Sequence, residues 1–474
     1  MSPWGQFSMS RDTKRLPALL TSARSADRAA VAHLEESQAE PFGDYYAYAP
    51  GSMILVDSSW DIPQDVSQGE LEIAVRSAGN GCFRGTVRTV RGPDKTVLAE
   101  SDTAVASSDS EVVRARWVRT PDPLQAPDGQ SLLELVRQRW PQIAVPRWKS
   151  INGRQTNIIA IMFPEELRKG VTGDGWVFVV QQGRKGGQVF AARTGRYSRA
   201  DFGERIPALG PLARKRVALF GLGGIGGPAA LEFARAGLGE LRVLDHDFVD
   251  PGTTVRWPLG LGAAGQLKTS ALPAFIEREY PFTTVRRWNR RIGDVVLVPS
   301  AQQTTDLDVI AEMIDGVDLI FDATAEPGIH HLLGDYAWTQ GIPYITAHGT
   351  AGAAGGLVAR LDPRRPTGCW VCLQKALYEN KTIDEPPFDE EGHVQPLGCG
   401  DPTFTGAGFD MAEIALEAVR IATGTLCAET EGGYPSSAWD VAVLSMRTND
   451  GTRVPPNWKI HSLPPHPDCS CTRR

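Results

Sequence analysis

A glycine-rich turn between an apolar strand and a helix is the feature that most constrains the fold of this chain. The segment 217–227 reads Val-Ala-Leu-Phe-Gly-Leu-Gly-Gly-Ile-Gly-Gly. Such an apolar strand needs cover on both faces, as a central parallel strand has. Gly221, Gly223 and Gly226 lack Cβ atoms where the backbone must turn tightly and approach a phosphate, and the next helix points its N–H groups at that anion. The motif predicts a nucleotide site, but by itself it fits NAD, FAD and ATP.

The chain after the turn keeps alternating strands with helices. Asp245 ends the next apolar strand, in Leu-Arg-Val-Leu-Asp-His-Asp at 241–247, and is placed to bind a ribose hydroxyl. Predicted strands at 217–220, 241–245 and 317–322 alternate with predicted helices at 228–237, 266–279 and 328–340. This order predicts an α/β fold with a Rossmann-like, doubly wound parallel sheet.

The N-terminal part has a different pattern. Residues 1–40, rich in Ala, Ser and charge, are interpreted as a leader that is mobile or helical. Residues 41–198 contain runs that alternate apolar with polar side chains, around one helical segment at 131–140, and predict an α+β domain of unknown role. Cys82 lies in one of these strand-like runs, where we expect it to be buried.

The third region, 199–474, is expected to be the α/β domain with additions at its end. Residues 382–397 are acidic, contain proline and lack periodicity, which predicts a loop. Residues 411–423 have one apolar face and predict a helix that stops at Gly424.

Composition limits the function classes. The chain has 474 residues, enough for two or three domains, and a formal net charge of −7, which argues against a general nucleic-acid binder. No apolar stretch approaches the roughly 18 residues needed to cross a bilayer, and the N-terminus lacks the apolar core of a signal peptide. We therefore expect no membrane partner and a cytoplasmic location.

Cysteines gather near the end of the chain, with six of the seven after residue 365. Cys369 and Cys372 form one close pair, and Cys469 and Cys471 form another. Four thiolates in two pairs are what a closed structural Zn²⁺ site requires. The second pair has one intervening residue where two are usual, which strains simultaneous ligation, and His466 could replace one thiolate. Free or disulfide-paired cysteines are the alternative.

Four further residues after the turn can carry chemistry. Arg256 and Lys268 can neutralise the charge that builds on a triphosphate during attack at the α-phosphorus, although either could be a surface cation. Asp322 ends an apolar strand, a usual position for ligand-facing carboxylates. Cys399 lies between glycines, which leave its sulfur accessible, and a nearby helix N-terminus would favour its thiolate; an incidental loop cysteine is the alternative.

This ordered set resembles the ThiF/MoeB-type activating enzymes, which include ubiquitin-activating enzymes, over about residues 198–474. The order is Gly-x-Gly-Gly-x-Gly, Asp-x-Asp, Arg, Gly-Gln-x-Lys, Asp-x-Thr, Cys-x-x-Cys, loop cysteine, helix and terminal cysteine pair. The resemblance implies ATP- and Mg²⁺-dependent adenylation of the C-terminal carboxylate of a ubiquitin-like or sulfur-carrier protein. For the nucleotide, it implies that four glycines hold the phosphates (Gly221, Gly223, Gly224, Gly226), that two carboxylates bind the nucleotide (Asp245 on the ribose, Asp247), and that two cations bind the triphosphate (Arg256, Lys268). It also implies that Asp322 lies by the Mg²⁺ site and that Cys399 is the thioester cysteine of a crossover loop at about 373–405. The C-terminal tail is expected to bind zinc.

The chain departs from the family pattern in three places. The usual Asn-Leu-x-Arg is Thr-Thr-Val-Arg at 253–256, and the usual Asp-x-Thr-Asp ends in Ala325, so a metal-binding carboxylate is absent. Asp322 or Glu326 is a candidate to take over. The shortened terminal cysteine pair is the third departure. With these departures and its large N-terminal domain, the chain is similar to the activating enzymes of bacterial ubiquitin-like conjugation operons, some of which act in phage defence.

The leading hypothesis is therefore adenylation of a ubiquitin-like protein, thioester formation on Cys399 and transfer to a conjugating-enzyme-like protein, by an enzyme that we expect to be a homodimer as family members commonly are. A sulfur-carrier protein adenylyltransferase of the thiamine or molybdopterin type is the alternative within this class. A nicotinamide- or flavin-dependent oxidoreductase and a non-catalytic scaffold are the alternatives of other classes.

Overall fold

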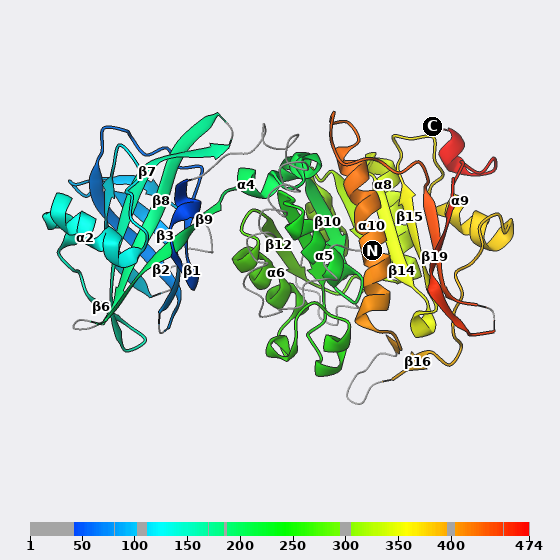
Figure 1. Ribbon diagram of the computed structural model, residues 1–474. Helices are drawn as coiled ribbons and strands as arrows, with labels where there is room; N and C mark the ends of the chain where they lie inside the picture. Colours follow the sequence, from blue (N-terminus) through cyan, green and yellow to red (C-terminus); the bar gives the residue numbers. More distant parts are fainter. Residues whose placement is uncertain are drawn as a thin grey trace, which may run out of the picture. The chain divides into compact units, whose positions relative to one another are not determined.

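The computed structural model describes residues 42–473 apart from 80, 102–110, 169, 184–186, 294–304, 396–402 and 449. The predicted leader at 1–40 lies outside the described residues. The chain divides into two compact units, of which the first ends at Arg196 and the second begins at Tyr197 (Figure 1).

The N-terminal unit is a strand barrel with two short helices. Its elements are η2 (Phe42–Tyr45), β1 (Tyr48–Asp57), β2 (Gln68–Gly79), β3 (Cys82–Arg91), β4 (Val97–Glu100), β5 (Val112–Arg119), α2 (Gly129–Arg139), α3 (Pro141–Ala144), β6 (Lys149–Ile151), β7 (Arg154–Arg168), β8 (Val171–Gln182) and β9 (Gln188–Tyr197). The sheet order is β1-β9-β8-β7-β5-β2-β3-β4, and an additional pairing of β1 with β3 closes it. The predicted α+β content is present, but the closure into a barrel was not predicted.

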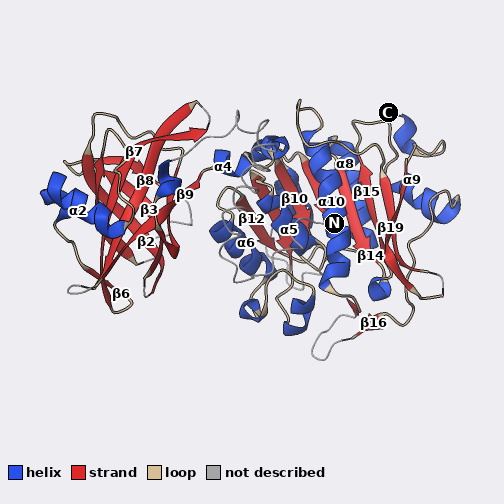
Figure 2. Ribbon diagram, in the orientation of Figure 1, coloured by secondary structure: helices blue, strands red, loops and turns tan. Residues whose placement is uncertain are grey.

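Strands β7 and β8 are buried on both faces along much of their length, because one face fills the barrel and the other lies under α2. Along β7, Ile158 and Ala160 belong to the interior core with Phe178 of β8, whereas Ile159 and Ile161 pack with the apolar face of α2. Figure 2 shows α2 on the outside of the strands. Cys82 is half-buried, so the prediction of burial is wrong: it begins β3, and its thiol donates to the Gly51 carbonyl at 3.2 Å.

The C-terminal unit contains an eight-stranded sheet in the order β12-β11-β10-β13-β14-β15-β18-β19. Its strands are β10 (Arg216–Phe220), β11 (Glu240–Asp245), β12 (Thr284–Asn289), β13 (Leu319–Asp322), β14 (Tyr344–Gly349), β15 (Gly355–Leu361), β18 (Val441–Arg447) and β19 (Arg453–His461). The first five strands of this order, β12 to β14, pair in parallel with one another, whereas the pairs β14–β15, β15–β18 and β18–β19 are antiparallel.

Helices cover both faces of this sheet. The helices are α4 (Arg199–Gly203), α5 (Gly226–Arg235), α6 (Lys268–Glu279), α7 (Asp306–Ile314), α8 (Pro327–Gln340), α9 (Trp370–Gln374) and α10 (Gly408–Cys427). In β10, Val217 and Leu219 pack with α5, α6 and α10, while Ala218 and Phe220 pack with α7, α8 and α9. This alternation confirms the predicted doubly wound α/β fold.

Two details of the C-terminal unit differ from the prediction. Helix α10 does not stop at Gly424 but continues to Cys427. A Cβ atom on Gly424 would lie 2.5 Å from the Pro435 carbonyl oxygen, so this glycine permits a close approach within the helix instead of ending it. The predicted loop at 382–397 contains the two-residue strand β16 (His393–Val394), which pairs with β17 (Thr403–Phe404).

Among the described residues, no helix combines the length and apolarity needed to span a membrane.

Candidate active site

The glycine turn connects β10 to α5. Gly221 follows β10 directly and has a φ of +85°, a left-handed conformation that glycine adopts without strain. A Cβ atom on Gly226 would lie 1.8 Å from the Gly221 carbonyl oxygen, so α5 can begin this close to the strand only with glycine there. Gly223 and Gly224 line a cavity. Gly221 and Gly226 therefore permit the turn, and Gly223 and Gly224 leave space beside it.

Two adjoining cavities, of about 570 and 780 Å³, open where the parallel strands end. Both are lined by the glycine turn, by the residues that follow β11 and β13, and by β17. The shared lining residues are Gly223, Asp247, Lys268, Ala323, Thr324, Ala325, Thr403 and Phe404. The carboxyl ends of the strands are where open α/β sheets bind ligands, and cavities of this size accommodate a nucleotide.

Two acidic residues after β11 organise this edge. Asp245 lines the larger cavity, and its carboxylate accepts from the backbone N–H groups of Leu222 at 2.6 Å and Asp247 at 2.8 Å. Asp247 accepts from Lys268 Nζ at 2.7 Å. Burial raises the pKa of Asp247, but the hydrogen bond and charge of Lys268 outweigh it, so the pKa is lowered overall. Lys268 is thereby held, 7% exposed, against both cavities.

Arg256 connects the smaller cavity to β17. Its guanidinium donates to the Phe404 carbonyl and to Thr403 Oγ1, both at 2.6 Å, and lies 5.0 Å above the Phe404 ring. Burial lowers its pKa. Arg256 therefore fixes β17, the first described segment after 396–402. Cys399 itself lies outside the described residues.

Asp322 does not face either cavity, which corrects the expectation of a ligand-facing carboxylate. It is fully buried, and its oxygens accept from Thr324 N and Oγ1, at 3.0 and 2.7 Å, and from Tyr344 Oη at 2.7 Å. His330 Nδ1 lies 2.9 Å from the second oxygen. Burial raises the pKa of Asp322, but the hydrogen bond and charge of His330 lower the pKa by more than burial raises it, so the net shift is downward. Through its two hydrogen bonds from Thr324, the buried Asp322 fixes the 323–325 turn that lines the cavities.

Sequence reasoning missed His330 and Tyr344 as partners of Asp322, since neither lies in a recognisable motif. The one sequence signal for such a pair is a histidine in the first turn of the helix that follows a strand ending in an acid. Ala325 has a φ of +58° and lines both cavities where the family pattern has a carboxylate. The next residue, Glu326, lines the larger cavity.

The four paired cysteines come together near α9, away from these cavities. The Sγ atoms of Cys369 and Cys372 are 3.9 Å apart, those of Cys369 and Cys469 3.5 Å, and those of Cys372 and Cys471 3.4 Å. A tetrahedral ion with Zn–S bonds of about 2.3 Å spaces its sulfurs about 3.8 Å apart. All four sulfurs lie within 4.8 Å of one another. The donor set therefore fits Zn²⁺, and the shortened second pair does not prevent it.

His466 contributes to this cluster through its backbone. Its N–H donates to Cys372 Sγ at 3.2 Å, whereas its Nδ1 accepts from the Asp468 N–H. A hydrogen bond from the Cys369 thiol lowers the pKa of Cys372, burial opposes this shift, and the hydrogen bond from the His466 amide lowers the pKa again, so the net shift is downward. Among the described residues, the side chains close enough to share a metal ion at this place are the four cysteines without His466, so the imidazole is not positioned as a substitute ligand.

The predicted site residues thus fall into three groups. The cavities bring together Gly221, Gly223, Gly224, Asp245, Asp247, Arg256 and Lys268, with Gly226 supporting the turn. Asp322 lies beneath them, and the cysteine cluster forms a separate site.

Comparison with known proteins identifies a family for the second unit. The ThiF family profile matches residues 200–438. Two uncharacterised proteins of Sinorhizobium fredii are similar to the chain: y4oA, 35% identical over 76% of this chain and 62% of its own length, and y4qC, 32% identical over 98% and 82%. The adenylyltransferase and sulfurtransferase uba4 of Aspergillus terreus is 28% identical over 46% of this chain and 43% of its own length. The chain thus spans less than two thirds of y4oA and of uba4.

Among solved structures, Escherichia coli MccB with ATP aligns over 58% of this chain and 71% of its own, with 16% identity and a TM-score of 0.41.

Proposed function

Because this chain belongs to the ThiF family, we propose that it is an adenylyltransferase that uses ATP to activate the C-terminal carboxylate of a ubiquitin-like protein. The observation that carries the proposal is the convergence of the glycine turn, Lys268 and Arg256 on two adjoining cavities at the edge of the parallel sheet. The similarity to a named adenylyltransferase supports it.

In the proposed reaction, a carboxylate oxygen of the protein tail attacks the α-phosphorus of ATP. The bond from this phosphorus to the bridging oxygen breaks, and pyrophosphate leaves. Lys268 stabilises the negative charge that develops on the phosphates, and Asp247 holds its ammonium in place. Arg256 is the second cation, at the wall that the smaller cavity shares with β17. Asp245 is placed for the ribose hydroxyls.

Two metal ions belong to the proposal. Mg²⁺ neutralises phosphate charge when it is bound, and it is typically held by one or two carboxylates together with the phosphates. Asp322 is fully buried, so we assign this role to Glu326, which lines the larger cavity beside Ala325. Zn²⁺ is assigned to Cys369, Cys372, Cys469 and Cys471, where it would join the C-terminal tail to α9.

We further propose that Cys399 receives the acyl group. Its thiolate attacks the acyl carbon, the bond to the phosphate oxygen breaks, and AMP leaves to give a thioester, which a conjugating-enzyme-like protein then accepts. The hydrogen bonds of Arg256 to β17 support this assignment, because they connect the segment after Cys399 to the cavity wall. A bacterial ubiquitin-like conjugation pathway, antiphage pathways included, and a homodimeric enzyme complete the proposal.

The sulfur-carrier alternative is favoured by one observation, the name of the uba4 relative, which is also a sulfurtransferase. In this version the adenylated tail becomes a thiocarboxylate. Mass spectrometry of the small protein after reaction distinguishes the two products.

The test offers the purified chain a set of candidate small proteins with free C-termini and measures exchange of radiolabelled pyrophosphate into ATP. Exchange that depends on the small protein is the expected result, and its absence with every candidate would contradict adenylation. Cys399→Ala should keep exchange and lose the covalent adduct that dithiothreitol reverses. Cys82→Ala, in the other unit, is the control that should keep both.

A further inference from the structure

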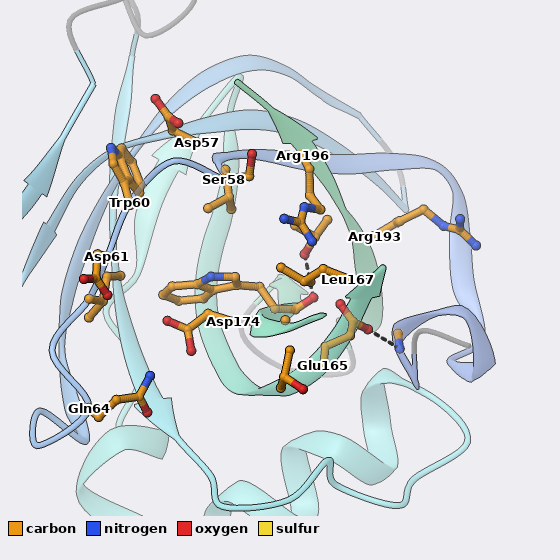
Figure 3. A pocket seen from close by; sticks show the side chains of 18 of the residues that line it. Asp57, Ser58, Trp60, Asp61, Gln64, Glu165, Leu167, Asp174, Arg193 and Arg196 are labelled. Atoms are coloured by element: carbon orange, nitrogen blue, oxygen red, sulfur yellow. Dashed lines mark hydrogen bonds between the residues drawn. The ribbon is translucent and has the colours of Figure 1, made fainter. Parts of the chain in front are cut away.

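A cavity of about 380 Å³ opens at one end of the N-terminal barrel (Figure 3). It is lined by the last residues of β1, the loop 58–64, the hairpin of β7 and β8, and the end of β9. The mouths of barrels are common places for ligands, and this volume is near the lower end of the range for ligand pockets, about 300–1,000 Å³. The cavity therefore suits a ligand the size of one long side chain better than a nucleotide.

Two tryptophans give the cavity an aromatic wall. Trp176 is 5% exposed and is fixed by the barrel core, since its ring stacks on Phe178 at 6.1 Å and lies 6.1 Å from Trp117. Trp60, in the loop after β1, is partly buried against the same core. An aromatic face attracts a cation through its quadrupole and packs well against an aliphatic stem.

Four carboxylates surround the cavity, and two of them already accept hydrogen bonds from nearby backbone N–H groups. Asp57 accepts from the Ser59 N–H at 2.9 Å, and Glu165 accepts from the Gly43 N–H at 2.6 Å. The remaining two, Asp61 and Asp174, line the cavity together with both tryptophans, and Figure 3 shows them on the side of Trp60 and away from Arg193.

The charge of Asp61 and Asp174 is compensated incompletely. Burial raises the pKa of Asp174, Arg119 lowers it, and the charge of Asp61 raises it again, with a net upward shift. Arg119 is shared, because its Nη2 donates to the Ile62 carbonyl at 2.9 Å and to Asp174 at 3.3 Å. No ion pair reaches Asp61 within the parts of the chain that the structure describes. A further positive charge at this place would relieve both carboxylates.

The arginines at the cavity do not supply that charge. The Arg193 guanidinium lies 5.1 Å from the Tyr48 ring centroid, which holds it toward the other side. Figure 3 shows Arg193 and Arg196 apart from Trp60 and Asp61. The acidic and aromatic side therefore remains open to a cation from outside the chain.

We propose that the mouth of the N-terminal barrel binds an organic cation, an ammonium or guanidinium head on an aliphatic stem, between the carboxylates of Asp61 and Asp174 and against the rings of Trp60 and Trp176. This chemistry is offered by a lysine or arginine side chain of a partner protein and by a free amine. The site is independent of the proposed adenylation.

Calorimetric titration of the full chain tests this proposal. The probes are n-butylammonium, n-butylguanidinium and the neutral n-butanol. We expect at least one cation to bind and n-butanol not to bind. Asp61→Asn should weaken the cation by about tenfold or more, since it removes a charged acceptor. Asp65→Asn replaces an exposed acid in the same connection between β1 and β2 that does not line the cavity, so it is the matched control and should bind as the unchanged chain does.

Several outcomes would overturn the proposal: no binding of either cation, equal binding of n-butanol, or equal weakening by Asp61→Asn and Asp65→Asn. Asp61 is exposed, so its variant should fold, and Trp60→Leu gives a second variant that should also weaken the cation. Tighter binding of a capped Gly-Lys-Gly peptide than of n-butylammonium identifies a protein side chain as the source, and the reverse identifies a free amine. Pyrophosphate exchange should be unchanged in Asp61→Asn, so failure of one proposal leaves the other testable.

Discussion

The cavities of the C-terminal unit are shaped by backbone turns at the ends of neighbouring parallel strands, whereas the barrel mouth of the N-terminal unit is shaped by charged and aromatic side chains. At the first site, glycines and the 323–325 turn form the walls, and Lys268, Arg256, two arginines (Arg290 and Arg291) and a few carboxylates provide charge. At the second, Asp61, Asp174 and two tryptophans provide the chemistry. A site built on turns needs glycine at fixed spacings, so it leaves a motif in the sequence. A site built by side chains from distant strands leaves none.

The difference extends to what holds each unit together, and metal removal should test it with the largest effect. The four-cysteine cluster lies entirely in the C-terminal unit, while residues 42–196 contain Cys82 as their only cysteine and no histidine. A chelator should therefore destabilise the C-terminal unit by several kcal/mol, because metal binding contributes directly to folding. The barrel should be unaffected. Thermal unfolding followed by calorimetry should show two transitions, of which one shifts.

Elemental analysis provides the control for that experiment. About one zinc per chain is expected in protein purified without chelator, and less in Cys372→Ser but not in Cys82→Ser. If the metal-free protein melts at the same temperature as the untreated protein, the cysteine cluster does not contribute to stability through a metal.

Loss of the buried cation should separate the two sites by function. Lys268→Ala is expected to reduce pyrophosphate exchange by about 10²–10³-fold, since it removes a fixed charge from the place where phosphate charge develops. Cation binding at the barrel mouth should not change. Lys459→Ala is the matched control, because Lys459 also pairs with an aspartate, Asp384, at 2.8 Å but is exposed on β19. Equal losses in both variants would place the effect outside the cavities.

These tests also mark how far sequence reasoning reached. Buried parallel strands appear as short apolar runs and the turn requires glycine, so the order of β10, α5, β11 and β13 could be predicted. The direction of Asp322 could not, because a shift of one residue at a strand end moves a side chain to the other face. Barrel closure could not be predicted either, since it rests on the parallel pairings of β1 with β3 and of β5 with β7, between segments separated in the chain.

The site residues show the same division. Asp245, Arg256 and Lys268 were found because they follow the glycine turn in a recognisable order along the chain. The barrel mouth combines residues 43–64 with residues 165–196, and no local pattern connects the two segments. His330 was missed because it acts through Asp322 and touches neither cavity.

Acid should also distinguish the two units. Burial, and then the charge of His330, lower the pKa of His348 from 6.5 to about 4. A histidine whose folded pKa is depressed contributes stability that is complete above about pH 6.5 and is lost as the pH falls toward 4. The loss from this group is about 3 kcal/mol. The C-terminal transition should therefore fall over this window, whereas the barrel, without histidine in residues 42–196, lacks this contribution.

Melting His348→Leu as a function of pH checks the assignment, because removing the buried imidazole should flatten the C-terminal curve between pH 6.5 and 4. His331→Gln is the control, since His331 is exposed on α8 and should leave the slope unchanged. The same slope in His348→Leu as in the unchanged chain would assign the loss to other groups.

The smallest expected effect concerns Ala325, a residue of the cavity wall whose left-handed backbone conformation does not suit alanine. Its φ of +58° is a left-handed conformation that asparagine and aspartate tolerate better than alanine does. Ala325→Asn should therefore raise stability by a few tenths of a kcal/mol up to about 1 kcal/mol. Ala325→Asp should gain the same and also supply a carboxylate beside Glu326, which lowers the Mg²⁺ concentration that half-saturates exchange. Comparing the two variants isolates charge from backbone relief. If they share one Mg²⁺ dependence, a carboxylate at this position does not reach the ion, and the metal is held through Glu326 and the phosphates alone.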